Sequence, residues 1–298
     1  MLKQRSVNGW SLPGCLCLVL AVCFATSFAT SAQTSPVTYR HIVRHDPNFS
    51  IQVVTIDLAD PRVSARVSRG GPQPAGDDVW DTTLLPPSEI AGREHFDIAI
   101  NGDFFDAKAT KDAEGRKSGY VRGKLACPVG PAMTDGQLWH STDQACPYVE
   151  ITTNHTVKLI EGHPHDPIDP AAWEIIGGGQ IIVRHGQTIA FTNKFGITRN
   201  PRTVVGLDRT GQLMTFFVVD GRQPSLSIGM TLADLSHEMI ALGCDSAINL
   251  DGGGSTTLVY RDPATKQLKV LNSPSDTRER SVADVLGVTV NAPLPEPK

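Results

Sequence analysis

Three aspartates in this chain follow short apolar runs, and each sits in a glycine-containing turn. They are Asp103 in Asn101-Gly102-Asp103, Asp220 in Asp220-Gly221-Arg222, and Asp251 in front of three glycines. A single Asp-Gly pair is most often a β-turn. Ligand sites, however, commonly form where neighbouring strands end, because the loops there converge while the strands hold them rigid. The repetition predicts one pocket lined by Asp103, Asp220 and Asp251, with acid, base or charge-stabilising roles.

The run from Asn249 to Ser255 has the composition of an anion-binding loop. Strand alternation places Asn249 and Asp251 on the same face of the apolar segment. Gly252, Gly253 and Gly254 lack Cβ atoms, so their N–H groups, with the Ser255 hydroxyl, can approach an anion closely. No Lys follows at the spacing of a nucleotide-binding phosphate loop. The alternative is a glycine-rich hairpin without a ligand.

Arg202 and Arg222 are the candidate partners for a phosphate group, since guanidinium offers a planar fork that matches two phosphate oxygens. The alternative for either residue alone is a surface salt bridge. The predicted binding set completes these arginines with polar residues of the same segments: Asn101, Thr203, Asn249, Gly252, Gly253, Gly254 and Ser255.

No cofactor is required by these residues, but a divalent cation is an alternative. Three aspartates can supply the oxygen ligands that a hard cation prefers. The segment His163-Pro164-His165-Asp166 also has a metal-like composition, although it lies in a Pro-rich loop. The sequence favours a loop without zinc at the histidine segment and leaves a divalent cation at the three aspartates open.

Charge and the amino-terminal segment limit the partners and the location. The chain has 27 Lys and Arg against 31 Asp and Glu, a formal net charge of −4, without a clustered basic run, so nucleic acid is not an expected partner. Lys3 and Arg5 precede an apolar core from Cys15 to Ala25, the order of a secretory signal, here residues 1–32. That core is shorter than the roughly 20 residues that span a bilayer. We expect a secreted or periplasmic protein without stable membrane insertion.

Three cysteines remain after the predicted signal. In an oxidising compartment, Cys127 and Cys146 are predicted to form a disulfide that closes a Gly/Pro-rich loop. Cys244 follows Gly243 and precedes an apolar strand, which indicates a buried free thiol.

The elements that must position these residues are short strands and few helices. Strands are expected at Ile51 to Leu58, Phe96 to Ile100 and Ala247 to Leu250, a hairpin at 204–219, and a helix from Thr231 to Gly243. Residues 107–144 are polar and are expected to form a long surface excursion. This pattern predicts one α+β domain over 36–292, with a mixed β-sheet, hairpins and a few packed helices, followed by a Pro-rich tail at 293–298.

Together these segments resemble the phosphodiester glycosidase family. The matching positions, in the family's order, are Asn101 to Phe105, Gly177 to Gly179, Pro201 to Thr203 with Val205-Gly206, Asp220 to Arg222, Gly229 to Leu232, Asn249 to Ser255, and Arg280 with Val282. Gln180 and Ser281 stand where the family usually has proline. The resemblance implies hydrolysis of the sugar C1–O bond of a sugar 1-phosphodiester, which releases free sugar and a phosphomonoester. The substrate would be a sugar phosphodiester or an envelope polysaccharide.

Two other functions fit the same residues. A metal-dependent phosphodiesterase would cleave P–O, with the three aspartates as ligands. A non-catalytic module would bind envelope polysaccharide without turnover.

Overall fold

The computed structural model describes Gly9 and residues 34–76, 79–111 and 119–297. The described residues from Ser35 onward form one compact unit. The predicted signal segment lies outside the described residues, except for Gly9. Among the described residues, no helix has the length and apolar character needed to cross a membrane.

The largest sheet carries most of the predicted site segments. Its seven strands are, in spatial order, β1 (Val37–Arg44), β2 (Phe49–Asp57), β16 (Leu213–Val219), β15 (Arg202–Leu207), β17 (Ser246–Asn249), β13 (Gln180–Arg184) and β14 (Gln187–Thr188). The predicted strands at 51–58 and 247–250 and the hairpin at 204–219 are confirmed as β2, β17 and β15–β16.

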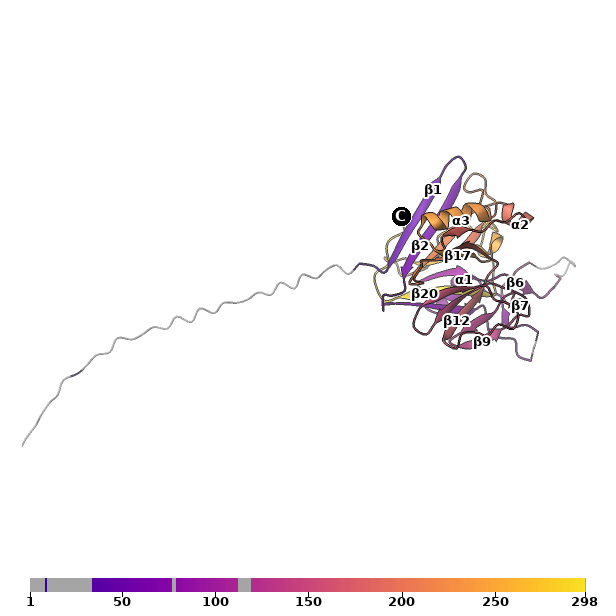
Figure 1. Cartoon of the computed structure of the whole chain (residues 1–298), viewed down its shortest axis with the longest axis horizontal. Helices are drawn as coiled ribbons and strands as arrows, with labels where there is room; N and C mark the ends of the chain where they lie inside the picture. Colours follow the sequence, from indigo (N-terminus) through magenta and orange to yellow (C-terminus); the bar gives the residue numbers. More distant parts are fainter. Residues whose placement is uncertain (1–8, 10–33, 77–78, 112–118, 298) are drawn as a thin grey trace, which may run out of the picture. The chain divides into compact units, whose positions relative to one another are not determined.

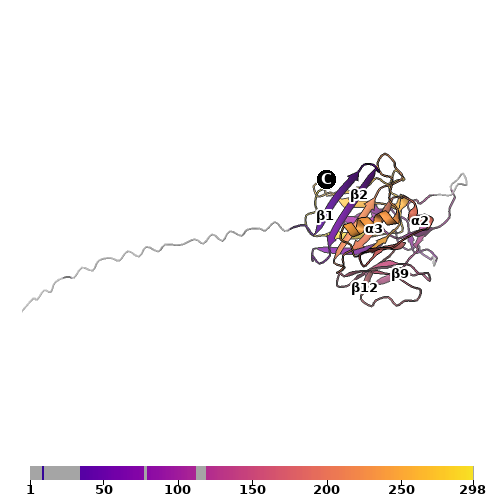
Figure 2. The ribbon, with the colours of Figure 1, turned by 45° about the horizontal axis from the view of Figure 1, so that its top comes forward.

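Strand alternation divides the apolar residues of this sheet between two cores. In β16, Phe216 and Val218 belong to one hydrophobic cluster, whereas Phe217 and Val219 belong to another. The second cluster includes apolar residues of α3 (Leu232–Ala241), which packs on β13, β14 and β17 (Figures 1 and 2). Both faces of the sheet are therefore buried.

The first cluster joins the large sheet to two five-stranded sheets. One has the order β19 (Leu268–Val270), β18 (Leu258–Arg261), β5 (Ile98–Asn101), β20 (Asp284–Val290) and β3 (Val63–Arg69). The other has the order β11 (Val157–Ile160), β10 (Tyr148–Thr152), β12 (Ala172–Gly177), β8 (Ala132–Thr134) and β9 (Gln137–His140). A small sheet has the order β4 (Thr82–Thr83), β7 (Leu125–Pro128) and β6 (Phe105–Ala107).

The helices are short. The far face of the β5 sheet is covered by α1 (Pro87–Arg93), whose Ile90 and Ala91 pack with Phe96 and Val285. The predicted helix after Thr231 is confirmed as α3, with a capping box between Thr231 and Asp234. The remaining helices are α2 (Lys194–Ile197) and the 3-10 turn η1 (Gly253–Ser255).

Three expectations about the fold are corrected. The predicted α+β fold is mainly β, and the mixed sheet is wrong, because every described strand pair is antiparallel. The passage from β16 through α3 to β17 makes these two strands parallel, but β15 lies between them. The excursion at 107–144 also contains β7, β8 and β9, which its polar composition concealed.

The predicted Cys127–Cys146 disulfide is also wrong, because both cysteines are free thiols, as is Cys244. Cys127 lies in β7 of the small sheet, whereas Cys146 precedes β10 and donates its S–H to the Gly178 carbonyl, 3.4 Å away. Cys127 belongs to the small sheet and Cys146 lies next to a strand of a five-stranded sheet. The spacing of cysteines in a sequence does not show which sheet each of them joins.

The packing between the β5 sheet and α1 can be tested at Gly287 in β20. A Cβ at this position would collide with the ring of Phe96, which is fully buried. We expect Gly287→Ala to lower the free energy of unfolding by about 1–3 kcal/mol, measured by urea denaturation. Gly92→Ala is the control, because its Cβ would meet only Leu268 Cδ1 at 3.8 Å in an exposed part of α1. Equal stability of the two variants would contradict this packing.

Candidate active site

A cavity of about 310 Å³ lies where the loops after β17 and β16 meet the segment before β15. We call it the Asp251 cavity. Its lining consists of Phe104, Phe195, Asn200, Arg202, Arg222, Asp251, Gly252, Gly253, Gly254 and Arg280. Among these described residues, Asp251 is the one carboxylate, facing three arginines and two aromatic rings.

Asp251 is held in place by the loop that follows it. Its Oδ1 accepts a hydrogen bond from Gly252 N–H at 2.7 Å, and its own N–H donates to the Gly102 carbonyl at 3.1 Å. Burial raises the pKa of Asp251 to about 6, although Ser255, the Gly252 N–H, Arg280 and Arg222 each act to lower it. A carboxyl group with this pKa changes its charge near neutral pH, as proton transfer requires.

The glycines make room for two guanidinium groups. A Cβ on Gly253 would lie 2.9 Å from Arg222 Nη2, and a Cβ on Gly254 would collide with Arg280 Nη2. Gly253 also has a φ of 61°, in the left-handed region that favours glycine. The glycine run therefore lets two cations approach the backbone beside Asp251.

The two guanidinium groups have different anchors. Arg222 donates from Nε and Nη2 to Asn200 Oδ1, a neutral acceptor, at 3.2 and 3.0 Å. Arg280 is bound to Asp276 Oδ2 at 2.8 Å, and its guanidinium lies 4.7 Å from the ring centre of Tyr120. Both side chains reach the cavity with hydrogen-bonding capacity left for an anion.

Arg202 has a different role from the one expected of a phosphate ligand. It is 1% exposed, and its Nη2 donates to the carbonyls of Phe195 and Thr198 at 2.8 and 3.0 Å. Its guanidinium also lies 4.3 Å from the centre of the Phe195 ring. Burial, with Arg222 nearby, lowers its pKa to about 10. Arg202 therefore holds the α2 segment and the Phe195 ring against the cavity wall.

Asn101, Thr203 and Asn249 lie beneath the cavity rather than on its surface. Asn101 Oδ1 accepts from the Thr203 hydroxyl at 2.7 Å, and its Nδ2 donates to the Asp251 carbonyl at 2.8 Å. Asn249 Nδ2 donates to the Leu250 carbonyl at 2.8 Å. These contacts tie β5 to β15 and fix the start of the Asp251 loop.

Asp103 pairs with a carboxylate that the sequence analysis did not select, Asp284 of β20. The Asp103 N–H donates to Asp284 Oδ1 at 2.8 Å, and Asp103 Oδ2 accepts from Gly130 N–H at 2.6 Å. Asp103 Oδ1 and Asp284 Oδ2 are buried without a hydrogen-bond partner among the described residues. Burial and the charge of Asp284 raise the pKa of Asp103 well above its usual range, and burial raises that of Asp284 to about 7.

Asp220 lies outside the cavity. Its Oδ1 accepts hydrogen bonds from Asn272 Nδ2 at 3.1 Å and Ser273 N–H at 2.8 Å, and Ser227 donates to its carbonyl. It therefore ties the end of β16 to the segment after β19. Of the three predicted aspartates, the structure brings Asp103 close to Asp251 and places Asp220 in a separate network.

The buried pair of Asp103 and Asp284 is expected to make the stability of the protein depend on pH. The unfolded chain loses the Asp284 proton near pH 4, whereas the folded chain keeps it until about pH 7, so its contribution to folding falls as pH rises across that window. We expect Asp284→Asn to flatten the profile of unfolding free energy, by up to about 1.4 kcal/mol per pH unit. Urea denaturation at pH 4.5 to 7.5 measures this, with exposed Asp106→Asn as control. Parallel profiles for wild type and Asp284→Asn would contradict it.

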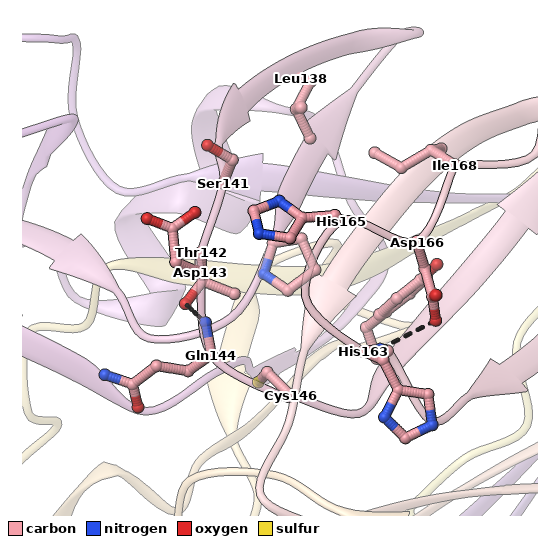
Figure 3. Close-up of a pocket in the computed structure, with 13 residues that line it drawn as sticks. Leu138, Ser141, Thr142, Asp143, Gln144, Cys146, His163, His165, Asp166 and Ile168 are labelled. Carbon is pink, nitrogen blue, oxygen red and sulfur yellow. Dashed lines mark hydrogen bonds between the residues drawn. The ribbon is translucent and has the colours of Figure 1, made fainter.

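The segment from His163 to Asp166 lines part of a second cavity, of about 290 Å³, together with Cys146 (Figure 3). The His163 and His165 rings point in different directions, and Asp166 Oδ2 accepts from the His163 backbone N–H at 3.0 Å (Figure 3). Within the described ranges, no group of three or more His, Cys, Asp or Glu is arranged to hold a metal. The ligand set proposed for a metal phosphodiesterase is not assembled, because Asp220 lies in its own network.

Sequence reasoning did not assign site roles to Phe104, Phe195, Asn200, Arg280 and Asp284. One signal was available for Asp284, which begins the apolar run Val285 to Val288 just as Asp251 ends one. Arg280 stood in a matched segment, but no spacing linked it to Gly254. Phe195 lies in a four-residue helix, and only the hydrogen bond from Arg202 to its carbonyl in the folded structure places it at the cavity.

The comparisons with known proteins bear on the family and on the fold. The family model for phosphodiester glycosidase matches residues 94–289. The chain therefore belongs to the phosphodiester glycosidase family.

Two curated relatives match parts of the chain. The N-acetylglucosamine-1-phosphodiester alpha-N-acetylglucosaminidase of Mus musculus is 29% identical over 164 residues, which are 48% of this chain and 31% of that protein. The uncharacterised SPbeta prophage-derived protein YomE of Bacillus subtilis is 34% identical over 91 residues, 30% of this chain and 13% of that protein. The chain thus aligns with less than a third of either relative's length.

Two solved structures share the fold. The zebrafish N-acetylglucosamine-1-phosphodiester alpha-N-acetylglucosaminidase catalytic domain, auto-inhibited by its pro-peptide, has a TM-score of 0.60 at 20% identity, covering 86% of this chain and 82% of that one. A hypothetical protein from Synechocystis has a TM-score of 0.50 at 18% identity, covering 86% of this chain and 62% of that one.

Proposed function

We propose that this protein hydrolyses the bond between the anomeric carbon and oxygen of a sugar 1-phosphodiester, and releases free sugar and a phosphomonoester. The observation that carries the proposal is the composition of the Asp251 cavity, in which one carboxylate faces Arg222 and Arg280 across the glycine run. Membership of the phosphodiester glycosidase family supports the same reaction class. The name of the mouse relative makes N-acetylglucosamine the first sugar to test.

The cavity suits a reaction in which phosphate departs. A phosphate monoester has a second pKa of about 6, so it leaves without a dedicated general acid, unlike the leaving group of an ordinary glycosidase with two carboxylates. Arg222 and Arg280 stabilise the charge that develops on the phosphate. Asp251, rather than fully buried Asp103, activates the water or stabilises the cationic sugar ring, because Asp251 lines the cavity.

The rings of Phe104 and Phe195 form the part of the Asp251 cavity in which we place the sugar. Phe104 and Phe195 meet edge to face, with ring centres 6.0 Å apart, and Phe195 is 36% exposed. An aromatic face packs against the apolar C–H face of a sugar ring, while polar groups on the opposite wall fix its orientation. Arg202 acts in this proposal through Phe195 rather than on the phosphate.

The reaction is tested by incubating the protein with N-acetylglucosamine 1-(methyl phosphate) in ¹⁸O-labelled water. Release of methyl phosphate without the label supports cleavage of the C1–O bond, because the anomeric oxygen of the free sugar exchanges with water whichever bond breaks. Label in the phosphate would instead show P–O cleavage, the reaction of a phosphodiesterase. Calorimetric binding without turnover would show a binding module.

We also propose that the protein is exported, on the basis of Lys3, Arg5 and the apolar run from Cys15 to Ala25. Its substrate would then be a sugar phosphodiester or a polysaccharide of the cell envelope. Detection of the mature amino terminus near Ala32 in the exported fraction of the host cells would support this location.

A further inference from the structure

A larger cavity adjoins the Asp251 cavity, and Arg280 lines both of them. We call it the Tyr120 cavity. Its volume is about 680 Å³, against about 310 Å³ for the Asp251 cavity, and its wall includes Tyr120, Arg122, Arg278 and Glu279. The family match and the sequence motifs assign it no role.

Two contacts connect the cavities. The Arg280 guanidinium lies 4.7 Å from the centre of the Tyr120 ring, and the Tyr120 ring in turn contacts Phe105 with centres 5.2 Å apart. Phe105 directly follows Phe104, which lines the Asp251 cavity. A ligand whose phosphate lies at Arg280 can therefore extend from one cavity into the other.

Among the described charged residues that line the Tyr120 cavity, two have no partner of opposite charge, the cation Arg278 and the anion Glu279. Asp276 accepts from Arg280, Glu279 accepts from the Ser88 N–H and hydroxyl at 2.9 and 2.6 Å, and Arg122 pairs with Glu89 at 2.9 Å. Arg278 is exposed, and among the described residues it makes no hydrogen bond or ion pair. Its guanidinium is free to bind an anion.

We infer that the Tyr120 cavity is the subsite for the leaving group of the substrate, and that Arg278 binds a second phosphate on that group. This inference rests on the proposed function, since it assigns the sugar to the Asp251 cavity and the first phosphate to Arg280. Two residues of extended chain span at most about 7 Å. Arg280 and Arg278 can thus contact two phosphates joined by a short polyol, as in a chain of sugar or polyol phosphates.

Binding of product fragments tests the subsite without turnover. Calorimetry compares glycerol 1,3-bisphosphate with glycerol 1-phosphate on the wild-type protein at one low salt concentration, because exposed charges are screened by salt. We expect the bisphosphate to bind about tenfold more tightly. Arg278→Ala should abolish this preference, and Arg278→Lys should restore part of it. Arg209→Ala is the matched control, since Arg209 is 87% exposed in the turn between β15 and β16 and should leave the preference unchanged.

Turnover distinguishes this inference from the proposed function. N-acetylglucosamine 1-phosphodiesters with a methyl or a 3-phosphoglyceryl leaving group are compared by the ratio of their kcat/KM values, which should fall about tenfold in Arg278→Ala. Equal fragment binding by the wild type, or a preference that survives in Arg278→Ala, would overturn the subsite. A wild-type bisphosphate preference that Arg278→Ala abolishes, without sugar release from either substrate, would support the subsite and overturn the proposed hydrolysis.

Discussion

Replacing Asp251 with asparagine is expected to lower kcat for sugar release by about 10²- to 10⁴-fold, the contribution of proton transfer by one positioned group. The amide keeps the shape of the side chain and can still accept from Gly252 N–H. It cannot take a proton or carry the negative charge. The loss should therefore appear in kcat rather than in stability.

The pH profile of the wild type adds an independent readout. The pKa of Asp251, about 6, lies in the range that kinetics can follow. If the carboxylate is the active form, kcat/KM rises with pH through about 6 and then levels off, and this step disappears in Asp251→Asn. Sugar release is measured from pH 4.5 to 8.

A matched control separates the charge of Asp251 from a general loss of acidic groups. Asp106 is exposed in β6 and does not line the Asp251 cavity, so Asp106→Asn should keep wild-type turnover. More than a tenth of wild-type turnover in folded Asp251→Asn would remove Asp251 from the mechanism. Asp103 would then need a route to solvent that its burial does not provide.

The strands and the glycine loop were predictable from sequence because their signals are local. Alternating and β-branched runs gave β2, β15 and β16, and Thr231 with Gly243 marked the ends of α3. The Asn249 to Ser255 run identified Asp251 and the three glycines that line the cavity. Each of these features depends on residues within one short segment.

The remaining parts of the site depend on contacts between distant segments. Arg280 approaches Gly254 across 26 positions, and Asp284 reaches Asp103 across 181. Asp220 and Arg202 carried the residue types of a site but satisfy other partners, Ser273 and the Phe195 carbonyl. A residue type shows what a side chain can do, whereas its partners in the fold decide which of those roles is available.

Gly254→Ala is expected to lower kcat/KM by roughly 10- to 100-fold while the protein remains folded. The added Cβ would collide with Arg280 Nη2 and Asp276 Oδ2, both at the ends of side chains that can move. The backbone need not shift, so the free energy of unfolding should change by less than about 1 kcal/mol. Displacing Arg280 removes a charge-assisted hydrogen bond to the phosphate, a loss of about 1.5–3 kcal/mol.

A double-mutant cycle shows whether the glycine acts through this arginine. If Gly254 matters because it admits the Arg280 guanidinium, Arg280→Ala causes a similar loss, and the double variant is no worse than Arg280→Ala alone. Additive losses would mean that Gly254 serves the anion through its own N–H instead. Measuring kcat/KM for the four proteins thus separates two functions of the glycine run, direct contact with the phosphate and space for the cation that contacts it.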